Sequence, residues 1–234
     1  WDYDNPAPPI LVNIEVDGRP LKAVVQVTKQ AFAYVFDRVT GEPIWPITER
    51  QVASSDIPGE RTSPTQPFPT KPAPFDLQGL TLDDLIDFTP ELKAQAVEIA
   101  SQYRIGPLFT PPSLAQAEDG TRGLIQIPGQ GGGANWEGAA VDVESGVLYV
   151  PSITNPIVRG LFNDPEHSDM NYVDARWRLP GPQGLPLVRP PWGRVTAIDL
   201  NTGEHLWMVP NGDTPEYVRD HPALAGIEIP RTGT

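Results

Sequence analysis

The sequence of 234 residues predicts an all-β fold that is interrupted by a helical insertion and by long proline-rich loops. Two short apolar runs, residues 23–27 and 32–36, are rich in the β-branched and aromatic residues that pack well on a pleated sheet. The 29 prolines and 21 glycines indicate many turns and loops between such strands. No apolar run has the roughly 18 residues that a membrane-spanning helix needs.

One pattern of strand, turn and strand occurs three times. Its turns are Asp37–Gly41, Asp142–Gly146 and Asp199–Gly203, in which aspartate can hydrogen-bond the turning backbone and glycine can take a positive φ. Trp45 and Trp207 follow the first and third aspartates at the same offset. Repeated hairpins with a recurrent aromatic residue are typical of β-propeller blades, which pack face to face. We therefore expect antiparallel hairpins in successive blades; the alternative is three unrelated hairpins with similar turns.

A segment of about residues 60–112 departs from this pattern and is predicted to be a helical insertion. Thr89 is a good N-cap and Pro90 suits the first helical position, so a helix is expected from there to Tyr103. A shorter helix is expected to begin near Thr81, with Asp84 as its capping acid. We expect residues 1–234 to form one partial propeller domain around this insertion.

Composition excludes several classes of function. The net charge of −13 repels phosphate backbones, so nucleic acid is not an expected partner. The absence of cysteine excludes disulfides, thiolate metal sites and a cysteine nucleophile. The three histidines lack metal-ligand spacing and no Ser-His-Asp set is visible, so neither a metal site nor a hydrolase triad is predicted within this chain.

The glycine-rich segment Gly129–Gly138 superficially resembles a phosphate-binding loop. It lacks the lysine and the helix that follow such a loop, and it leads into a strand instead. We favour a loop whose glycines let the backbone approach a ligand closely or turn sharply into a blade.

Several stretches together resemble one family of bacterial enzymes. The run KQAFAYVFDRVTGEPIW at residues 29–45, the opening WDYD, and the later stretches SPTQPFPTKPAPF, GPLFTPPS, NWEGAAVD and PWGRVTAIDLNTGEHLW resemble quinoprotein (PQQ-dependent) dehydrogenases. Among these, the sequence is most similar to the membrane-type quinoprotein glucose dehydrogenases, and next to the alcohol dehydrogenases. The resemblance covers most of residues 1–210 and implies a C-terminal fragment of the propeller.

This resemblance implies an eight-bladed propeller with pyrroloquinoline quinone near its axis, Ca²⁺ beside the quinone and an aspartate as base. Such an enzyme oxidises a glucose-like sugar or an alcohol and passes electrons to a respiratory quinone or cytochrome. It implies a periplasmic location, with any inner-membrane anchor outside this sequence, and contacts with the remaining propeller blades. The Ca²⁺ ligands and the base are expected upstream, so no catalytic residue is assigned within this chain, which alone should be inactive.

The resemblance assigns cofactor contacts to two residues. Lys29 stands where the family has a cation that hydrogen-bonds the quinone oxygens, and Asn155 resembles an asparagine near the quinone. The alternatives are a solvated lysine at a strand end and an ordinary loop asparagine before proline. Trp45 and Trp207 resemble tryptophans that pack between blades, and Trp136 resembles the aromatic residue that opens the next blade. A non-catalytic propeller scaffold that binds other proteins is the rival function, against which Lys29 and the insertion argue.

Overall fold

The computed structural model describes residues 1–234, which form four separate sheets and a few short helices. The first sheet is antiparallel, with the order β1-β2-β3. Its strands are β1 (Ile10–Val16), β2 (Arg19–Val27) and β3 (Ala33–Asp37). The return strand predicted through Trp45 is wrong: after β3 the chain makes a single bridge between Phe36 and Pro43, with bonds from Asp37 N–H to the Glu42 carbonyl at 2.8 Å and from Ile44 N–H to the Val35 carbonyl at 2.9 Å. Prolines 43 and 46 have no N–H to donate to a ladder.

The second sheet contains both of the other predicted hairpins. It is antiparallel, with the order β13-β12-β9-β8. Its strands are β8 (Ala140–Asp142), β9 (Val147–Ile153), β12 (Gly193–Asp199) and β13 (Glu204–Pro210). The hairpins at Asp142 and Asp199 are therefore confirmed, but they are two halves of one blade rather than two successive blades. The reason is that β9 and β12 pair along their whole length across the intervening long connection.

The three predicted turns share one geometry. In each, the glycine N–H donates to the aspartate carbonyl four residues earlier, at 2.8, 2.9 and 2.7 Å in chain order. In each, the aspartate carboxylate accepts from the N–H two residues on, at Val39, Glu144 and Asn201. The glycine φ angles are 80°, 74° and 73°, a region that disfavours residues with a Cβ. The repeat in the sequence therefore reflects a real repeat of turn structure.

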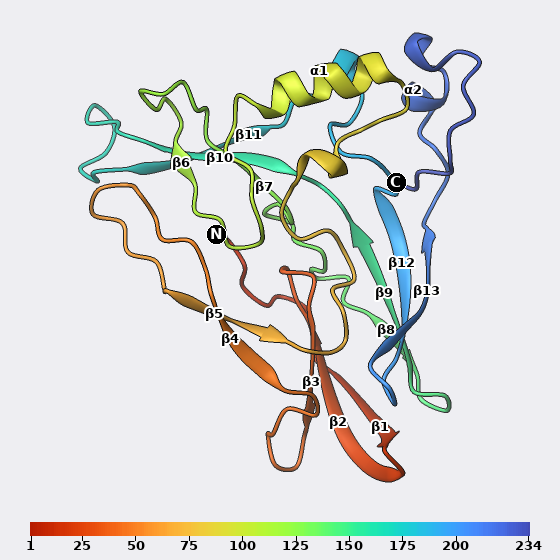
Figure 1. The fold of residues 1–234 in the computed structure, drawn as a ribbon. Helices are drawn as coiled ribbons and strands as arrows, with labels where there is room; N and C mark the ends of the chain where they lie inside the picture. The colour runs from red at the N-terminus through yellow and green to blue at the C-terminus, as the bar shows by residue number, and fades with distance from the viewer.

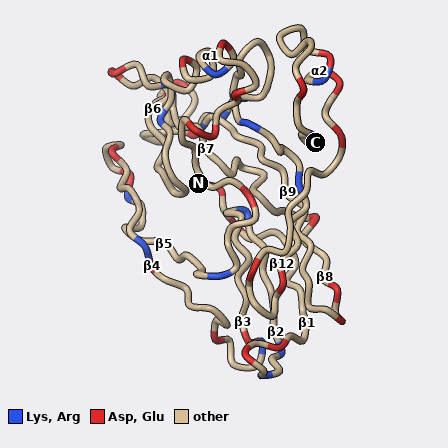
Figure 2. The backbone as a smooth tube through the Cα atoms, turned by 45° about the vertical axis from the view of Figure 1, so that its right-hand side comes forward, with Lys and Arg blue, Asp and Glu red and all other residues tan.

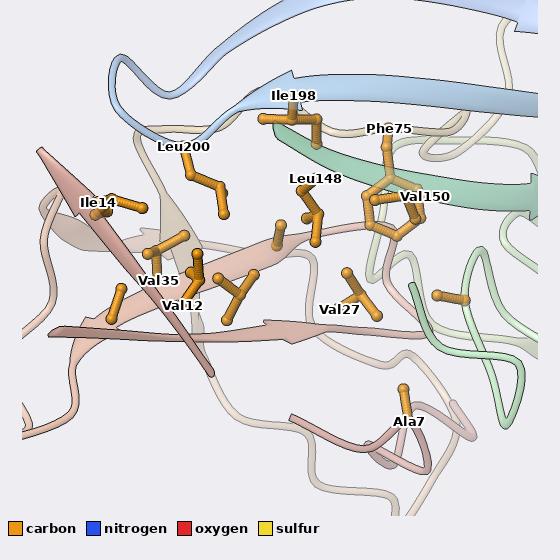
Figure 3. Close-up of a cluster of buried hydrophobic side chains, with 14 of the residues drawn as sticks. Ala7, Val12, Ile14, Val27, Val35, Phe75, Leu148, Val150, Ile198 and Leu200 are labelled. Carbon is orange, nitrogen blue, oxygen red and sulfur yellow. The ribbon is translucent and has the colours of Figure 1, made fainter. Parts of the chain in front are cut away.

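The first two sheets pack face to face. Sixteen buried residues fill the space between them, among them Val12, Val25, Leu148 and Ile198 (Figure 3). Trp45 packs at this contact, because a Cβ added to Gly203 would lie 3.0 Å from its indole ring. The two sheets thus have the relation of successive blades.

The other two tryptophans bury less surface than the resemblance implies. Trp207 is 44% exposed and lies on the edge strand β13, where its ring is tilted against Tyr149. Trp136, which was predicted to open the next blade, is 82% exposed and lies four residues before β8.

Two smaller sheets lie beside these blades (Figure 1). One is the antiparallel pair of β4 (Ile47–Gln51) and β5 (Thr65–Pro69). The other sheet comprises β6 (Ser113–Leu114), β7 (Leu124–Gln126), β10 (Ile157–Phe162) and β11 (Val173–Arg178). In this sheet β10 pairs with each of the other three strands. The predicted insertion therefore contains strands as well as helices.

Helix α1 (Pro90–Ala100) lies at the opposite end of the molecule from the tips of β1 and β2 (Figure 1). The Thr89 hydroxyl accepts from Leu92 N–H at 3.1 Å, as the N-cap prediction requires, but the helix ends three residues before the predicted Tyr103. Its buried side chains join a second core of 14 residues. The shorter helix is one turn of 3₁₀-helix, Leu82–Asp84, in which Thr81 N–H donates to the Asp84 carboxylate at 2.8 Å.

The remaining helices are short: α2 (Glu216–Arg219), η2 (Pro182–Gly184) and η3 (Pro222–Leu224). None of the helices combines the length and apolar composition required to cross a bilayer. Acidic residues lie at both ends of the molecule and also near the N-terminus in its middle (Figure 2).

Candidate functional site

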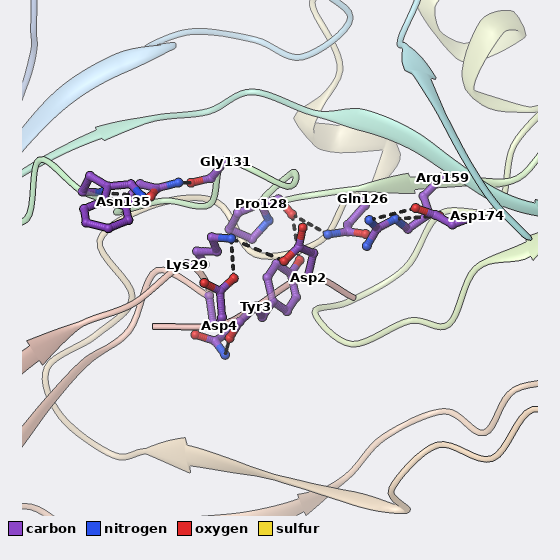
Figure 4. Close-up of polar contacts among 12 residues, drawn as sticks. Asp2, Tyr3, Asp4, Lys29, Gln126, Pro128, Gly131, Asn135, Arg159 and Asp174 are labelled. Atoms are coloured by element: carbon purple, nitrogen blue, oxygen red, sulfur yellow. Dashed lines mark hydrogen bonds and ion pairs between the residues drawn. The ribbon is translucent and has the colours of Figure 1, made fainter. Parts of the chain in front are cut away.

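Lys29 lies in the tight loop between β2 and β3, and its side chain is buried. The residue is only 7% exposed, and its ammonium pairs with Asp4 at 2.5 Å and Asp2 at 3.4 Å (Figure 4). The loop is closed by a bond from Thr28 N–H to the Phe32 carbonyl at 3.0 Å. The alternative of a solvated strand-end lysine is therefore wrong.

The two carboxylates belong to the opening WDYD stretch. Asp2 and Asp4 both contact Lys29, whereas the Tyr3 hydroxyl between them donates to the Pro128 carbonyl at 2.7 Å. Burial raises the pKa of the Tyr3 hydroxyl. In an extended segment, the side chains at positions i and i+2 point to the same side. The spacing of Asp2 and Asp4 in the sequence therefore indicates that the two carboxylates share one partner, although the sequence analysis did not predict it.

The pKa of Asp2 lies below its usual range. Partial burial raises the pKa of this carboxyl, but the charge of Lys29 and hydrogen bonds with Asp4, Lys29 and Gln130 lower it by more. Asp2 is therefore ionised at neutral pH, and its negative charge is stabilised by Lys29.

The glycine-rich loop packs directly on Lys29. Gly133 N–H donates to the Lys29 carbonyl at 2.9 Å, and a Cβ added to Gly132 would lie 2.5 Å from the Lys29 Cα. The Asn135 side chain extends from the same loop and donates to the Gly131 carbonyl at 2.8 Å (Figure 4). The glycines thus allow the loop to approach Lys29 closely, and an approach to a ligand stays a prediction. Asn135 is a second polar residue that sequence reasoning did not single out.

Asn155 lies at the other end of this loop. It is exposed in the connection between β9 and β10, and its carbonyl oxygen would be 2.3 Å from a Cβ added to Gly129. Its side chain makes no hydrogen bond within the chain, and it does not contact Lys29. The two predicted cofactor residues thus contact opposite ends of one glycine loop.

The residues around Lys29 fit a polar cofactor that offers both acceptor oxygens and an N–H group, such as pyrroloquinoline quinone. The Oε1 atoms of Gln30 and Gln126 are buried without a partner, and the Gln30 amide donates to the Tyr3 carbonyl at 3.0 Å. The Lys29 ammonium can donate to oxygens of a ligand, and the two unpartnered amide oxygens can accept from an N–H or O–H group of a ligand. For Ca²⁺ the residues present are incomplete, because no group of three or more His, Cys, Asp and Glu converges in the chain.

Comparison with known proteins places these features in a family. Residues 1–234 match the family described as "PQQ: Glucose/ethanol/alcohol dehydrogenase, beta-propeller domain". The chain is 30% identical to quinate/shikimate dehydrogenase (quinone) of Acinetobacter baylyi over 91% of its length, which is 28% of that protein. It is 31% identical to quinoprotein glucose dehydrogenase of Gluconobacter oxydans over 98% of its length, which is 30% of that protein.

One solved structure that the chain matches is the quinohemoprotein alcohol dehydrogenase from Comamonas testosteroni. The TM-score is 0.46 at 18% identity, over 89% of this chain and 25% of that one. The chain therefore spans less than a third of the length of the proteins it matches. The family match confirms the predicted fold class, a partial β-propeller whose sheets do not close into a ring.

Proposed function

Because the chain belongs to the glucose/ethanol/alcohol dehydrogenase β-propeller family, we propose that it forms part of a PQQ-dependent dehydrogenase that oxidises a sugar or an alcohol. The observation that carries this proposal is the buried ammonium of Lys29 between the Asp2 and Asp4 carboxylates. Buried charges are costly unless they are paired or used, so a lysine held here on a glycine-supported loop favours a functional role.

Lys29 is proposed to face the quinone oxygens. Bound pyrroloquinoline quinone supplies the two-electron acceptor for hydride from the substrate carbon. The ammonium of Lys29 stabilises the negative charge that accumulates during this transfer, and its burial makes that stabilisation stronger than it would be in water. Asn135 and Asn155, at the two ends of the glycine loop, are proposed as further polar contacts of the cofactor.

Asp2 is our candidate for the base that takes the substrate hydroxyl proton. We favour it over an aspartate upstream of the chain because it is ionised, partly exposed and in contact with Lys29. Asp4, which makes the shorter contact with Lys29, holds the ammonium in place. Ca²⁺ is proposed beside these groups, with most of its ligands supplied from outside the 234 residues.

The relatives also support a proposal for the cellular location of the enzyme. Proteins named as quinone-linked dehydrogenases of glucose and of quinate or shikimate are similar over most of this chain. We propose a periplasmic or membrane-associated enzyme that delivers electrons to a respiratory quinone or cytochrome. A glucose-like sugar is the proposed substrate, with alcohols second, and the remaining propeller blades are proposed to complete the fold.

Substitution of Lys29 in the complete enzyme tests the proposal. Lys29→Ala is expected to lower the maximal rate by about 10² or more, since one transition-state charge contact is lost. Lys71→Ala is the matched control, because Lys71 forms a surface ion pair with Glu204 far along the chain from Lys29. Near-normal turnover of the Lys29→Ala enzyme at saturating quinone would exclude the proposed role.

A further inference from the structure

A buried chain of hydrogen bonds holds the residue that precedes Asn155. This residue is Thr154, which is 6% exposed. Its hydroxyl accepts from the Arg194 guanidinium at 2.5 Å and donates to the Asp76 carboxylate at 2.5 Å. Its backbone N–H donates to the Trp192 carbonyl at 2.7 Å. Both the main chain and the side chain of Thr154 are therefore held in place.

The cation and the anion on either side of this hydroxyl form a buried ion pair. The Arg194 guanidinium lies 3.4 Å from the Asp76 carboxylate, whose side chain is only 2% exposed. Asp76 Oδ2 and Arg194 Nε are buried without a hydrogen-bond partner. Burial of two charges costs free energy that their attraction offsets only when the remaining polar atoms are also satisfied. The pair is therefore better explained by the position that it gives to Thr154 than by a contribution to stability.

The segment of residues 75–79, which includes Asp76, is attached to the loop that carries Lys29. The Phe75 N–H donates to the Ala31 carbonyl in this loop at 3.1 Å. The Phe75 ring is buried in the core between the first two sheets (Figure 3). Asp76 is thus held in a fixed position relative to Lys29 by its neighbour in the sequence.

The glycine-rich loop lies between this segment and Asn155. At one end of the loop, Gly133 N–H donates to the Lys29 carbonyl at 2.9 Å, and a Cβ added to Gly133 would lie 3.2 Å from the Phe75 ring. At the other end, a Cβ added to Gly129 would lie 2.3 Å from the Asn155 carbonyl oxygen. A shift of the connection that carries Asn155 would therefore also disturb the glycine-rich loop.

We propose that Thr154 is a positioning residue, whose hydroxyl fixes Asn155 and the glycine-rich loop relative to Lys29. Arg194 and Asp76 orient this hydroxyl, and the segment that carries Asp76 transmits the restraint to the Lys29 loop. Groups that are ordered before a ligand arrives lose little freedom when it binds, which favours affinity. The inference rests on the proposed function for the identity of the ligand, which is the quinone, and not for the order of these loops.

Hydrogen-exchange mass spectrometry of the complete enzyme without quinone tests the order of the loops. Thr154→Val removes the hydroxyl and keeps the branched shape of the side chain. The backbone amides at positions 133 and 154 should then exchange about tenfold faster or more, because a hydrogen-bonded restraint is lost. Thr154→Ser keeps the hydroxyl and should exchange at the wild-type rate. The Gly146 amide, which donates to Asp142 at 2.9 Å in a turn of the same sheet, should not change.

Thr232→Val is the matched control. Thr232 is fully buried, and its hydroxyl donates only to the carbonyl of the adjacent Gly233, at 3.3 Å. The substitution removes a buried hydroxyl that holds neither Asn155 nor the glycine-rich loop, so exchange at positions 133 and 154 should stay at the wild-type rate. Equally fast exchange in Thr232→Val and Thr154→Val would show a general loss of stability and would overturn the positioning role.

Titration of the apoenzyme with pyrroloquinoline quinone, followed by tryptophan fluorescence, tests the consequence for binding. The Kd should rise about tenfold in Thr154→Val and stay at the wild-type value in Thr154→Ser and Thr232→Val. Unchanged exchange at positions 133 and 154, or an unchanged Kd, in Thr154→Val would overturn the inference. Failure of the wild-type apoenzyme to bind the quinone would instead contradict the proposed function, and the exchange rates alone would then decide the inference.

Discussion

The ammonium of Lys29 lies 2.5 Å from a carboxylate oxygen of Asp4, and this contact ties the loop between β2 and β3 to the first residues of the chain. Asp2 completes the arrangement at 3.4 Å. A cation and two carboxylates of this kind can hold one another until a ligand enters, and then provide both a charge and a proton acceptor. Their mutual dependence can be measured without any activity assay.

Replacement of Lys29 should raise the pKa of Asp2. In the wild-type protein that pKa lies below 3.8, because the effect of Lys29 and the hydrogen bonds exceeds that of burial. Lys29→Gln removes the cation, so carbon-detected NMR titration should show the Asp2 carboxyl protonating at higher pH. The Asp142 carboxyl is the internal control, since its low pKa comes from Ser145 and Glu144 and should not change.

The same shift has a consequence for stability. The pKa of Asp2 is lower in the folded protein than in the unfolded chain, so the contact with Lys29 stabilises the folded protein above about pH 3.8. This stabilisation is lost as the pH falls through the pKa of Asp2 in the folded protein. The difference in unfolding free energy between wild type and Lys29→Gln should therefore shrink in acid. A difference that is unchanged between pH 7 and pH 3 would contradict the assigned pairing.

Two neighbouring glycines provide a test of the loop that supports Lys29. Gly132→Ala should destabilise the protein by about 2–5 kcal/mol, because φ is 76° there and a Cβ would lie 2.4 Å from the Lys29 Cγ. Gly131→Ala should change stability by less than about 1 kcal/mol, because nothing lies within 4 Å of its added Cβ. Urea unfolding measures both, and equal effects would show that the contact with Lys29 is unimportant.

The isolated chain is predicted to be inactive and to self-associate. Strand β13 is an edge strand with four consecutive apolar residues, 206–209, that are each 44–54% exposed. Dye-linked oxidation of glucose or ethanol should be absent with added quinone and Ca²⁺, because the chain has no complete Ca²⁺ site. Val209→Lys should reduce association in light scattering, whereas Val143→Lys, at an isolated exposed turn position, should not. Activity of the chain alone would refute this prediction.

The local features of the fold were predictable because short-range chemistry sets them. The Asp-to-Gly turns and the Thr89 cap each depend on residues within four positions, and both formed as expected. The missing return strand was also local in origin, since the prolines at 43 and 46 disrupt its ladder. Because both prolines are visible in the sequence, the absence of a regular return strand was predictable.

The long-range features were not predictable in the same way. The pairing of β9 with β12 crosses a connection of about 40 residues, and no pattern in the sequence specified that both hairpins share a sheet. The contact of Lys29 with Asp2 joins residues 27 positions apart. The resemblance pointed to Lys29, but only the packing of the glycine loop and the WDYD stretch showed what surrounds it.

A structure of the complete enzyme with pyrroloquinoline quinone bound tests the central claim most directly. The measured quantity is the distance from the Lys29 Nζ to the nearest quinone oxygen. We predict a hydrogen bond of about 3 Å, with Asp2 on the substrate side of the cofactor. A quinone bound elsewhere, with Lys29 still paired only to Asp2 and Asp4, would contradict the account.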